Sequence, residues 1–147
     1  MKKLRLLFSW WISLKLRMKS SGPTMFKKMG GQRGINSIVD DFYHIMATDP
    51  LAQECFMTHA GRDVRESAEK LKAFLSGWTG GPQLYLKKWG HPRLRMRHFQ
   101  FQIGPQEGEQ WLYCMKKALE NSSVKKEAQS ELMTAFKQIV KMISERH

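Results

Sequence analysis

The sequence predicts an all-α domain, and three observations lead to this fold class. Apolar residues recur every three or four positions in several long segments, which is the period of an amphipathic helix. Glycine- and proline-rich turns separate these segments, and none of them shows the strict alternation of a β-strand. With 147 residues, the chain is long enough for one domain with a full core. We therefore expect amphipathic helices that pack around a single core.

The predicted elements follow one another with short connections. In chain order they are a short helix at 25–29, a helix at 35–47, a helical turn at 51–55, a loop at 57–61, a helix at 63–78, a loop at 82–91, a helix from 104–105 to about 121, and a last helix from about 124.

The first half of this series rests on clear start and stop signals. Thr24 is suited to cap the short first helix, and Gly30-Gly31 ends it because paired glycines tolerate positive φ. The second helix carries Tyr43 on or beside its apolar face, and Thr48-Asp49-Pro50 ends it. A helical turn then leads to Phe56.

The second half is marked in the same way. Leu71 and Trp78 belong to one continuous apolar stripe, which Gly80-Gly81-Pro82 ends. Gly104-Pro105 opens the next helix, and Glu107 in its first turn is favourable to the helix dipole. The last helix repeats the same apolar period up to residue 143.

Residues 1–23 read as a basic extension outside the domain, which we place at 24–147. Residues 1–33 hold nine Lys and Arg and no acid, which leaves 16 basic against 13 acidic residues, or +3, from Gly34 onward. The apolar run at 6–14 is too short to span a bilayer as a helix. An interfacial amphipathic anchor in 1–20 and an extension without function both remain open.

The cysteine content indicates a reducing compartment, and we expect a cytoplasmic protein. Cys55 and Cys114 lie far apart and fit neither a CxxC metal site nor a disulfide-rich secreted framework. Apolar residues flank each of them, so both are expected to be small buried side chains, and a pairing between them stays open.

One stretch does not read as core or as an ordinary turn, namely Gly90-His91-Pro92-Arg93-Leu94-Arg95-Met96-Arg97-His98. No Asp or Glu occurs from Lys70 to Gln106, so an anionic group from outside is expected to neutralise the cations there. A neutral imidazole is a common metal ligand, and haem combines such a ligand with two anionic propionates. The alternative is a solvated basic surface or a phosphate-binding patch.

Several motifs in order resemble the truncated haemoglobins, specifically group II of that family. The resemblance runs from Thr24 to about Lys141. It rests on Gly30-Gly31, Phe42-Tyr43, Lys70-Leu71-Lys72-Ala73-Phe74-Leu75, Gly80-Gly81-Pro82, the block from Gly90 to His98, Phe101, Ile103, and Trp111-Leu112-Tyr113-Cys114-Met115.

This resemblance implies a truncated globin fold, a two-over-two helical sandwich around haem b. It makes His98 the metal ligand that holds the iron from the proximal side. It places Tyr43 and Trp111 on the distal side as hydrogen-bond donors to a bound gas, and Phe56 flat against the porphyrin. Some relatives carry a tyrosine in place of Phe56, so the network here loses one hydroxyl.

Further haem contacts follow from the same resemblance. Ser67 and Leu71 lie one helical turn apart and are expected over the haem. The propionates are expected to meet Lys70, Tyr85 and an arginine, since an arginine fork pairs well with a carboxylate. Arg95 and Arg97 are both candidates for this arginine, and the choice between them stays open.

The function implied is reversible binding of oxygen and other diatomic gases such as CO and NO, by a monomer or homodimer without a nucleic-acid partner. Oxygen transport and oxygen, NO or peroxide chemistry all stay open, and an accessory NO dioxygenase or peroxidase activity would need an external reductase. The alternative from another class is a basic helical adaptor that binds nucleic acid or an anionic membrane through residues 1–33 and 87–98. Membrane contact is otherwise expected only through residues 1–20.

Overall fold

A computed structural model describes residues 22–59, 64–91 and 104–144 of the chain, and in these ranges all regular structure is helical. The elements are α2 (Met25–Lys28), α3 (Gly31–Thr48), the 3-10 helix η1 (Pro50–Ala52), α4 (Gln53–His59), α5 (Val64–Trp78), α6 (Leu84–Trp89), α8 (Pro105–Glu120) and α9 (Lys126–Ser144). The predicted all-α class is confirmed.

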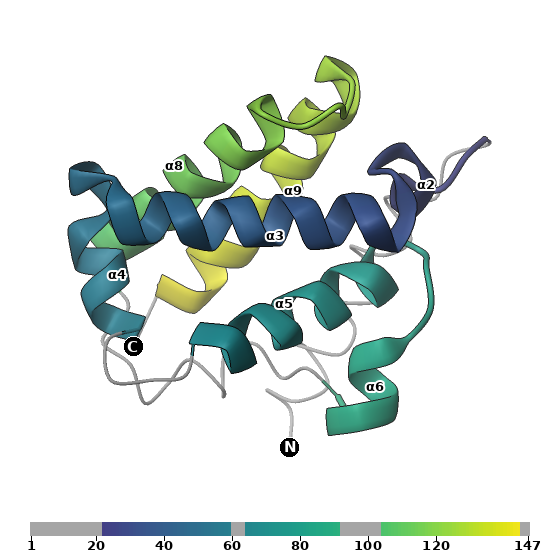
Figure 1. The fold of residues 1–147 in the computed structure, drawn as a ribbon, viewed down its shortest axis with the longest axis horizontal. Helices are drawn as coiled ribbons and strands as arrows, with labels where there is room; N and C mark the ends of the chain where they lie inside the picture. The colour runs from purple at the N-terminus through teal and green to yellow at the C-terminus, as the bar shows by residue number, and fades with distance from the viewer. Residues whose placement is uncertain (1–21, 60–63, 92–103, 145–147) are drawn as a thin grey trace.

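Four long helices form two layers. Helix α3 packs against both α5 and α8, and α8 packs in turn against α9 (Figure 1). The short helices attach to this frame, with α2 at the start of α3, α4 against α8 and α6 against α5. The arrangement is the two-over-two sandwich that the sequence analysis expects.

Aromatic side chains fill the space between the layers. Phe42 from α3, Trp78 from α5 and Phe136 from α9 are at most 1% exposed. The rings of Trp78 and Phe136 lie 5.1 Å apart, centroid to centroid, so α5 and α9 meet through aromatic packing.

The junction of α2 and α3 shows why glycine is needed there. Thr24 Oγ1 accepts a hydrogen bond from the Lys27 N–H at 3.3 Å, as predicted for an N-cap. Gly30 has φ of 90°, a left-handed conformation that favours glycine. Helix α3 then begins at Gly31, four residues before the predicted start, because no apolar residue marks its first turn.

Two predicted loops are partly wrong. Helix α4 continues to His59, so residues 57–59 are helical, and residues 84–89 form α6. The glycines and prolines around each short helix suggested a loop, but Tyr85 is buried and Leu86 packs against the core, which holds α6 in place. Gly90, with φ of 78°, ends that helix.

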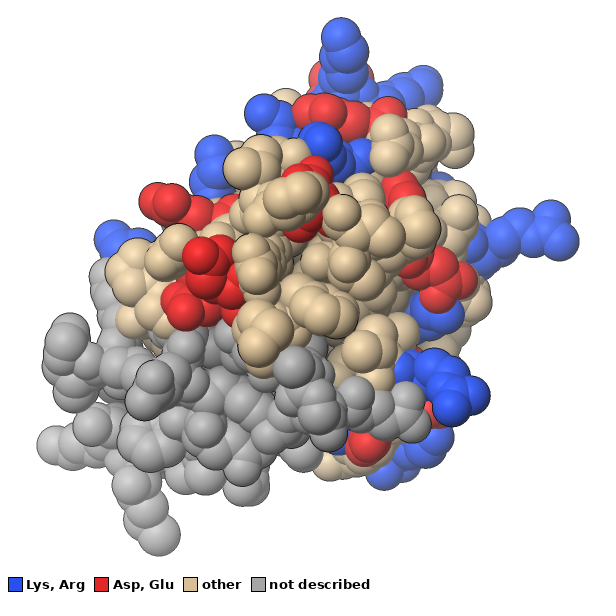
Figure 2. Space-filling view, turned by 60° about the vertical axis from the view of Figure 1, so that its left-hand side comes forward, with Lys and Arg blue, Asp and Glu red and all other residues tan. Residues whose placement is uncertain are grey.

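Charged groups of both signs are interspersed on the face that Figure 2 shows. None of the helices in the described ranges combines the length and the apolar character that a bilayer crossing requires. The predicted N-terminal extension falls outside the described residues, apart from its last two positions.

Candidate functional site

Seven of the ten predicted site residues lie in the described ranges, and five helices supply them. They are Tyr43 on α3, Phe56 on α4, Ser67, Lys70 and Leu71 on α5, Tyr85 on α6, and Trp111 on α8. His98, Arg95 and Arg97 lie outside the described residues, so their roles stay predictions.

Tyr43 and Trp111 both contact one buried ring, that of Phe42. The ring centroid of Phe42 is 5.0 Å from that of Tyr43 and 5.0 Å from that of Trp111, both in edge-to-face contact. The indole of Trp111 also contacts Phe136 at 5.3 Å. Helices α3 and α8 therefore bring together the two predicted hydrogen-bond donors, which are only partly buried.

The surroundings keep the phenol of Tyr43 protonated. Burial raises its pKa far above the ordinary value, and the nearby Cys55 adds to the shift. A protonated phenol can donate its O–H to a polar ligand, as the indole N–H of Trp111 can. The pair therefore offers two donors in an otherwise apolar setting.

The position of Phe56 depends on a joint between α4 and α8, namely the hydrogen bonds that Gln110 makes with Cys55 and Glu54, which were not predicted from the sequence. Gln110 Oε1 accepts a hydrogen bond from the Cys55 N–H at 2.8 Å, and Gln110 Nε2 donates to Glu54 Oε2. Nearby, the Tyr113 hydroxyl donates to Asp49 Oδ2 at 2.7 Å. The partners are 55 to 64 residues apart in sequence, so no local pattern signals these bonds.

The face of α5 carries Ser67 and Leu71 one turn apart, and both side chains are half-buried. Lys70 beside them forms an ion pair with Glu66, at 3.1 Å between Nζ and Oε1. To reach a propionate, Lys70 would exchange this carboxylate for that of the haem.

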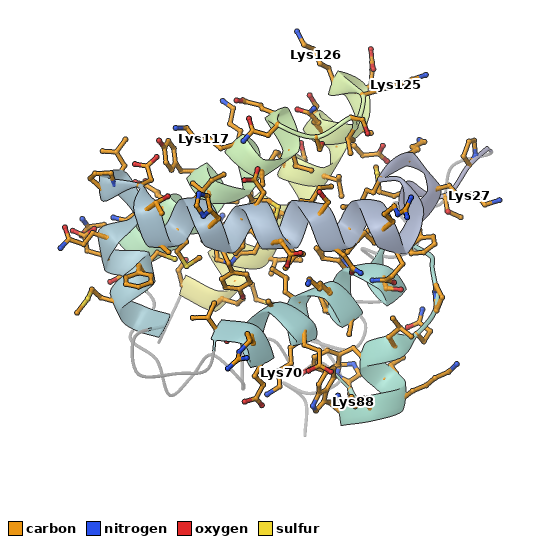
Figure 3. The ribbon with its side chains drawn as sticks, in the orientation of Figure 1. Lys27, Lys70, Lys88, Lys117, Lys125 and Lys126 are labelled. Carbon is orange, nitrogen blue, oxygen red and sulfur yellow. The ribbon has the colours of Figure 1, made fainter. Side chains whose placement is uncertain are left out.

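The expectation that only an outside group neutralises the cations after residue 70 is wrong for three lysines. Besides Lys70, Lys72 pairs with Asp40 at 2.7 Å, and Lys88 pairs with Glu69. Carboxylates that precede the acid-free stretch in sequence reach these lysines in space. Figure 3 shows Lys70 on α5 and Lys88 on α6 near one another.

These two lysines share an aromatic neighbour on α6. The ring centroid of Trp89 is 5.9 Å from Lys70 Nζ and 4.8 Å from Lys88 Nζ. Tyr85 is 6% exposed and lies between Trp89, at 5.1 Å, and Phe74, at 6.5 Å, measured between ring centroids. The predicted propionate contact Tyr85 thus belongs to a helix and is largely covered, instead of projecting from a loop.

The described residues fit a flat apolar group with an anionic edge. A set of half-buried apolar side chains from five helices packs against the core: Tyr43, Phe56, Leu71, Trp89 and Trp111. The ammonium of Lys70 lies beside Leu71 on the same helix. Among the described residues, no three His, Cys, Asp or Glu side chains group into a metal site.

Comparison with known proteins agrees with this geometry. The sequence model of the bacterial-like globin family matches residues 24–145. The group 2 truncated haemoglobin YjbI of Bacillus subtilis (strain 168) is 40% identical over 91 residues, which are 62% of this chain and 66% of that protein. The match thus spans slightly less than two thirds of that relative's length.

Two solved structures are also similar over most of this chain. The cold-adapted truncated haemoglobin of Pseudoalteromonas haloplanktis TAC125 has a TM-score of 0.80 and 35% identity, covering 85% of this chain and 100% of that one. The group II 2-on-2 haemoglobin of Agrobacterium tumefaciens has a TM-score of 0.81 and 30% identity, covering 88% of this chain and 100% of that one.

A helical domain in which α3 packs against α5 and α8, and α8 packs against α9, has the two-over-two architecture of a truncated globin. The chain belongs to the bacterial-like globin family, and within that family it is a group II truncated haemoglobin. Globins carry haem and bind diatomic gases such as oxygen, so the family gives this chain a haem cofactor.

Proposed function

We propose that this protein reversibly binds oxygen and other diatomic gases at a haem b whose iron is held by His98. The observation that carries the proposal is the placement of Tyr43 and Trp111, two partly buried donors from α3 and α8 that both contact Phe42. The haem iron supplies the coordination position for the gas, and the protein side chains set how long the gas stays.

Each described side chain has a part in this binding. Tyr43 and Trp111 donate hydrogen bonds to a polar gas ligand, because both hold a proton at neutral pH and neither competes for the iron. Phe56 would pack against the porphyrin, and Ser67 and Leu71 would lie over it. Lys70 and Tyr85, with Arg95 and Arg97, hold the propionates.

The haem domain in this proposal comprises residues 24–147, and residues 1–23 are an extension of it. The N-cap bond of Thr24 and the start of the family match at residue 24 support this boundary. The extension can act as an interfacial anchor through residues 1–20.

We also propose a cytoplasmic protein, monomeric or homodimeric. Two buried thiols, Cys55 and Cys114, support a reducing compartment. Any redox turnover, such as NO dioxygenation or peroxide reduction, would draw its electrons from an external reductase.

Absorption spectra of the haem-loaded protein test the proposal. Wild type should show a strong Soret band and a five-coordinate ferrous spectrum, whereas His98→Gly should lose that spectrum and regain it with added imidazole. His91→Ala is the matched control, since it removes the other histidine of the same motif. A wild-type spectrum in His98→Gly without imidazole would overturn the assignment of the ligand.

A further inference from the structure

Helix α4 is held to α8 by a single glutamine that uses both of its polar atoms. Gln110 Oε1 accepts the Cys55 N–H at 2.8 Å. Gln110 Nε2 donates to the carboxylate of Glu54, and this bond lowers the pKa of Glu54. Cys55 lies in the first turn of α4, where backbone N–H groups lack an acceptor within the helix. Gln110 therefore caps α4 from another helix.

Helix α4 is short and partly exposed, so fixed contacts with its neighbours matter for its position. It is seven residues long, and isolated helices of that length are not stable in water. Gln53, Glu54 and Met57 are exposed, with Met57 at 61%. Of the first five residues, only Cys55 is fully buried, and its Sγ lies 4.0 Å from Met46 Sδ on α3.

The same side of α8 holds the segment that precedes α4. Tyr113, three residues after Gln110 and so on the same helical face, donates to Asp49 at 2.7 Å. Asp49 also accepts the Leu51 N–H at 3.0 Å and so caps η1. Hydrogen bonds at Gln110 and at Tyr113 thus both connect α8 to the η1–α4 segment, and Lys117 of α8 adds an ion pair with Asp49.

We infer that Gln110 is a positioning residue for the haem site, and this inference rests on the proposed function. Its neighbour in sequence is Trp111, and the residues that it binds on α4, Glu54 and Cys55, directly precede Phe56. One side chain therefore sets the spacing between the distal donor on α8 and the ring that packs on the porphyrin. Loosening the joint lets α4 move away from α8, which weakens the packing on haem and admits water beside the gas.

Exchanging the donor and the acceptor in the hydrogen bond between Gln110 and Glu54 tests this inference. In Gln110→Glu, one carboxylate oxygen can still accept the Cys55 N–H, but the other faces the Glu54 carboxylate without a proton between them. Adding Glu54→Gln restores a donor and an acceptor with their positions exchanged. Glu109→Gln, on an exposed neighbouring position of α8, is the control for a Glu/Gln exchange that leaves the joint intact.

Two readouts separate positioning from a general loss of stability. Amide hydrogen exchange at residues 54–57 reports the joint directly and needs no haem. The stretching frequency of haem-bound CO and the rate of haem transfer to an acceptor apoprotein report the site. We expect Gln110→Glu to speed exchange at 54–57 and haem loss on the order of tenfold, and to shift the CO band. Wild-type behaviour should return in the double variant and persist in Glu109→Gln.

The inference is overturned if exchange at 54–57 stays at the wild-type rate in Gln110→Glu, or if the double variant shows no recovery. It is also overturned if the joint loosens while the CO band and haem transfer keep their wild-type values. A failure of the proposed function would look different, because wild type would then lack a haem spectrum while the exchange data still reported the joint.

Discussion

At the scale of single residues, the site depends on two polar atoms held in apolar surroundings. Tyr43 and Trp111 both contact Phe42, so packing orients their rings, and the O–H and the N–H are the groups through which they would recognise a ligand. A donor in a water-poor site interacts more strongly with a partly charged acceptor than it would in water. Small changes to either residue should therefore alter gas release much more than haem binding.

Replacing the donors should speed the release of oxygen. A hydrogen bond to a charged group contributes about 1.5–3 kcal/mol, and 1.4 kcal/mol is a tenfold change in an equilibrium constant. Trp111→Phe should thus raise the oxygen dissociation rate by roughly ten- to a hundredfold, because such changes fall mainly on the off-rate. Tyr43→Phe should have a smaller effect if Trp111 compensates. Stopped-flow oxygen dissociation measures both.

Carbon monoxide is the control ligand for this experiment, since its outer atom carries less negative charge. Its affinity should change less than that of oxygen in both variants. Equal oxygen dissociation rates in wild type and the two variants would show that neither donor reaches the ligand.

Asp49 should make the stability of the domain depend on pH. The hydrogen bond from Tyr113, then that from the Leu51 N–H, lowers the pKa of this carboxyl, and Lys117 contributes. A lowered folded-state pKa adds stability above the unfolded pKa of about 3.9, and this stability is lost as the pH falls through the folded value. Tyr113→Phe should lower the thermal midpoint at pH 7 by roughly 2–4 °C.

That difference in midpoint should shrink as the pH falls below about 4. Thermal unfolding followed by circular dichroism at several pH values measures it. The substitution keeps the aromatic ring under Lys117, whose Nζ is 4.9 Å from the ring centroid. A difference that stays constant from pH 7 to pH 3 would assign the effect to packing instead of to the hydrogen bond.

At the scale of elements, the sequence predicts the long helices well and the short ones poorly. The helices at 64–78 and 105–120 begin and end within a residue or so of their predicted limits, because each has a long apolar stripe and strong glycine or proline signals. Helix α6 has only six residues, too few for a period to show, and its stability comes from burying Tyr85. Such tertiary stabilisation leaves no signal in the local sequence.

The same division holds for the site. Motifs on long helices pointed to Tyr43 and Trp111, and the structure brings both into contact with Phe42, while their part in ligand binding stays a prediction. The joint at Gln110 could not be predicted, since a glutamine on a helix surface is ordinary and its partners are distant in sequence. The partners of Lys72 and Lys88 were missed for a similar reason: Asp40 and Glu69 come from elsewhere in the chain.

The junction of α2 and α3 allows a test in which two effects oppose each other. A Cβ on Gly34 would lie 1.8 Å from the carbonyl oxygen of Met29, a backbone atom that cannot turn aside. Helix propensity alone favours alanine over glycine by about 1 kcal/mol. We expect the clash to dominate, so that Gly34→Ala lowers the free energy of unfolding by about 1–3 kcal/mol.

Chemical denaturation of the haem-free and haem-loaded forms measures this effect. Ser37→Ala, at an exposed position of the same helix, is the control and should be neutral or slightly stabilising. A stabilised Gly34→Ala variant would mean that α2 can withdraw from α3 without loss.

At the scale of the whole molecule, aromatic contacts join both layers into one core. Phe136 of α9 contacts Trp78 of α5 at 5.1 Å and Trp111 of α8 at 5.3 Å, and Trp111 contacts Phe42 of α3 at 5.0 Å. All four long helices therefore meet through one connected set of rings. Within the described residues, every member of this set lies in α3 or a later helix.

A shortened chain that starts at Gly22 should accordingly fold and bind haem as the full chain does. It keeps Thr24, whose side chain caps α2, and every site residue named above. Titration with haem, followed at the Soret band, should give the same haem content per chain for both forms. A shortened chain that fails to fold or to bind haem would place residues 1–21 within the domain.

The alkylation rates of the two buried thiols should report how often the protein opens. Cys55 is 3% exposed and Cys114 is 0% exposed, and burial raises their pKa values from 9.0 to about 12 and about 11. Only thiolates react readily with alkylating reagents, so the closed molecule should be almost inert to them. Alkylation then proceeds at the frequency with which each thiol becomes accessible. The alkylation rate of Cys55, in the short helix α4, should report local openings. The alkylation rate of Cys114, within α8, should report only the rarer global unfolding of the domain.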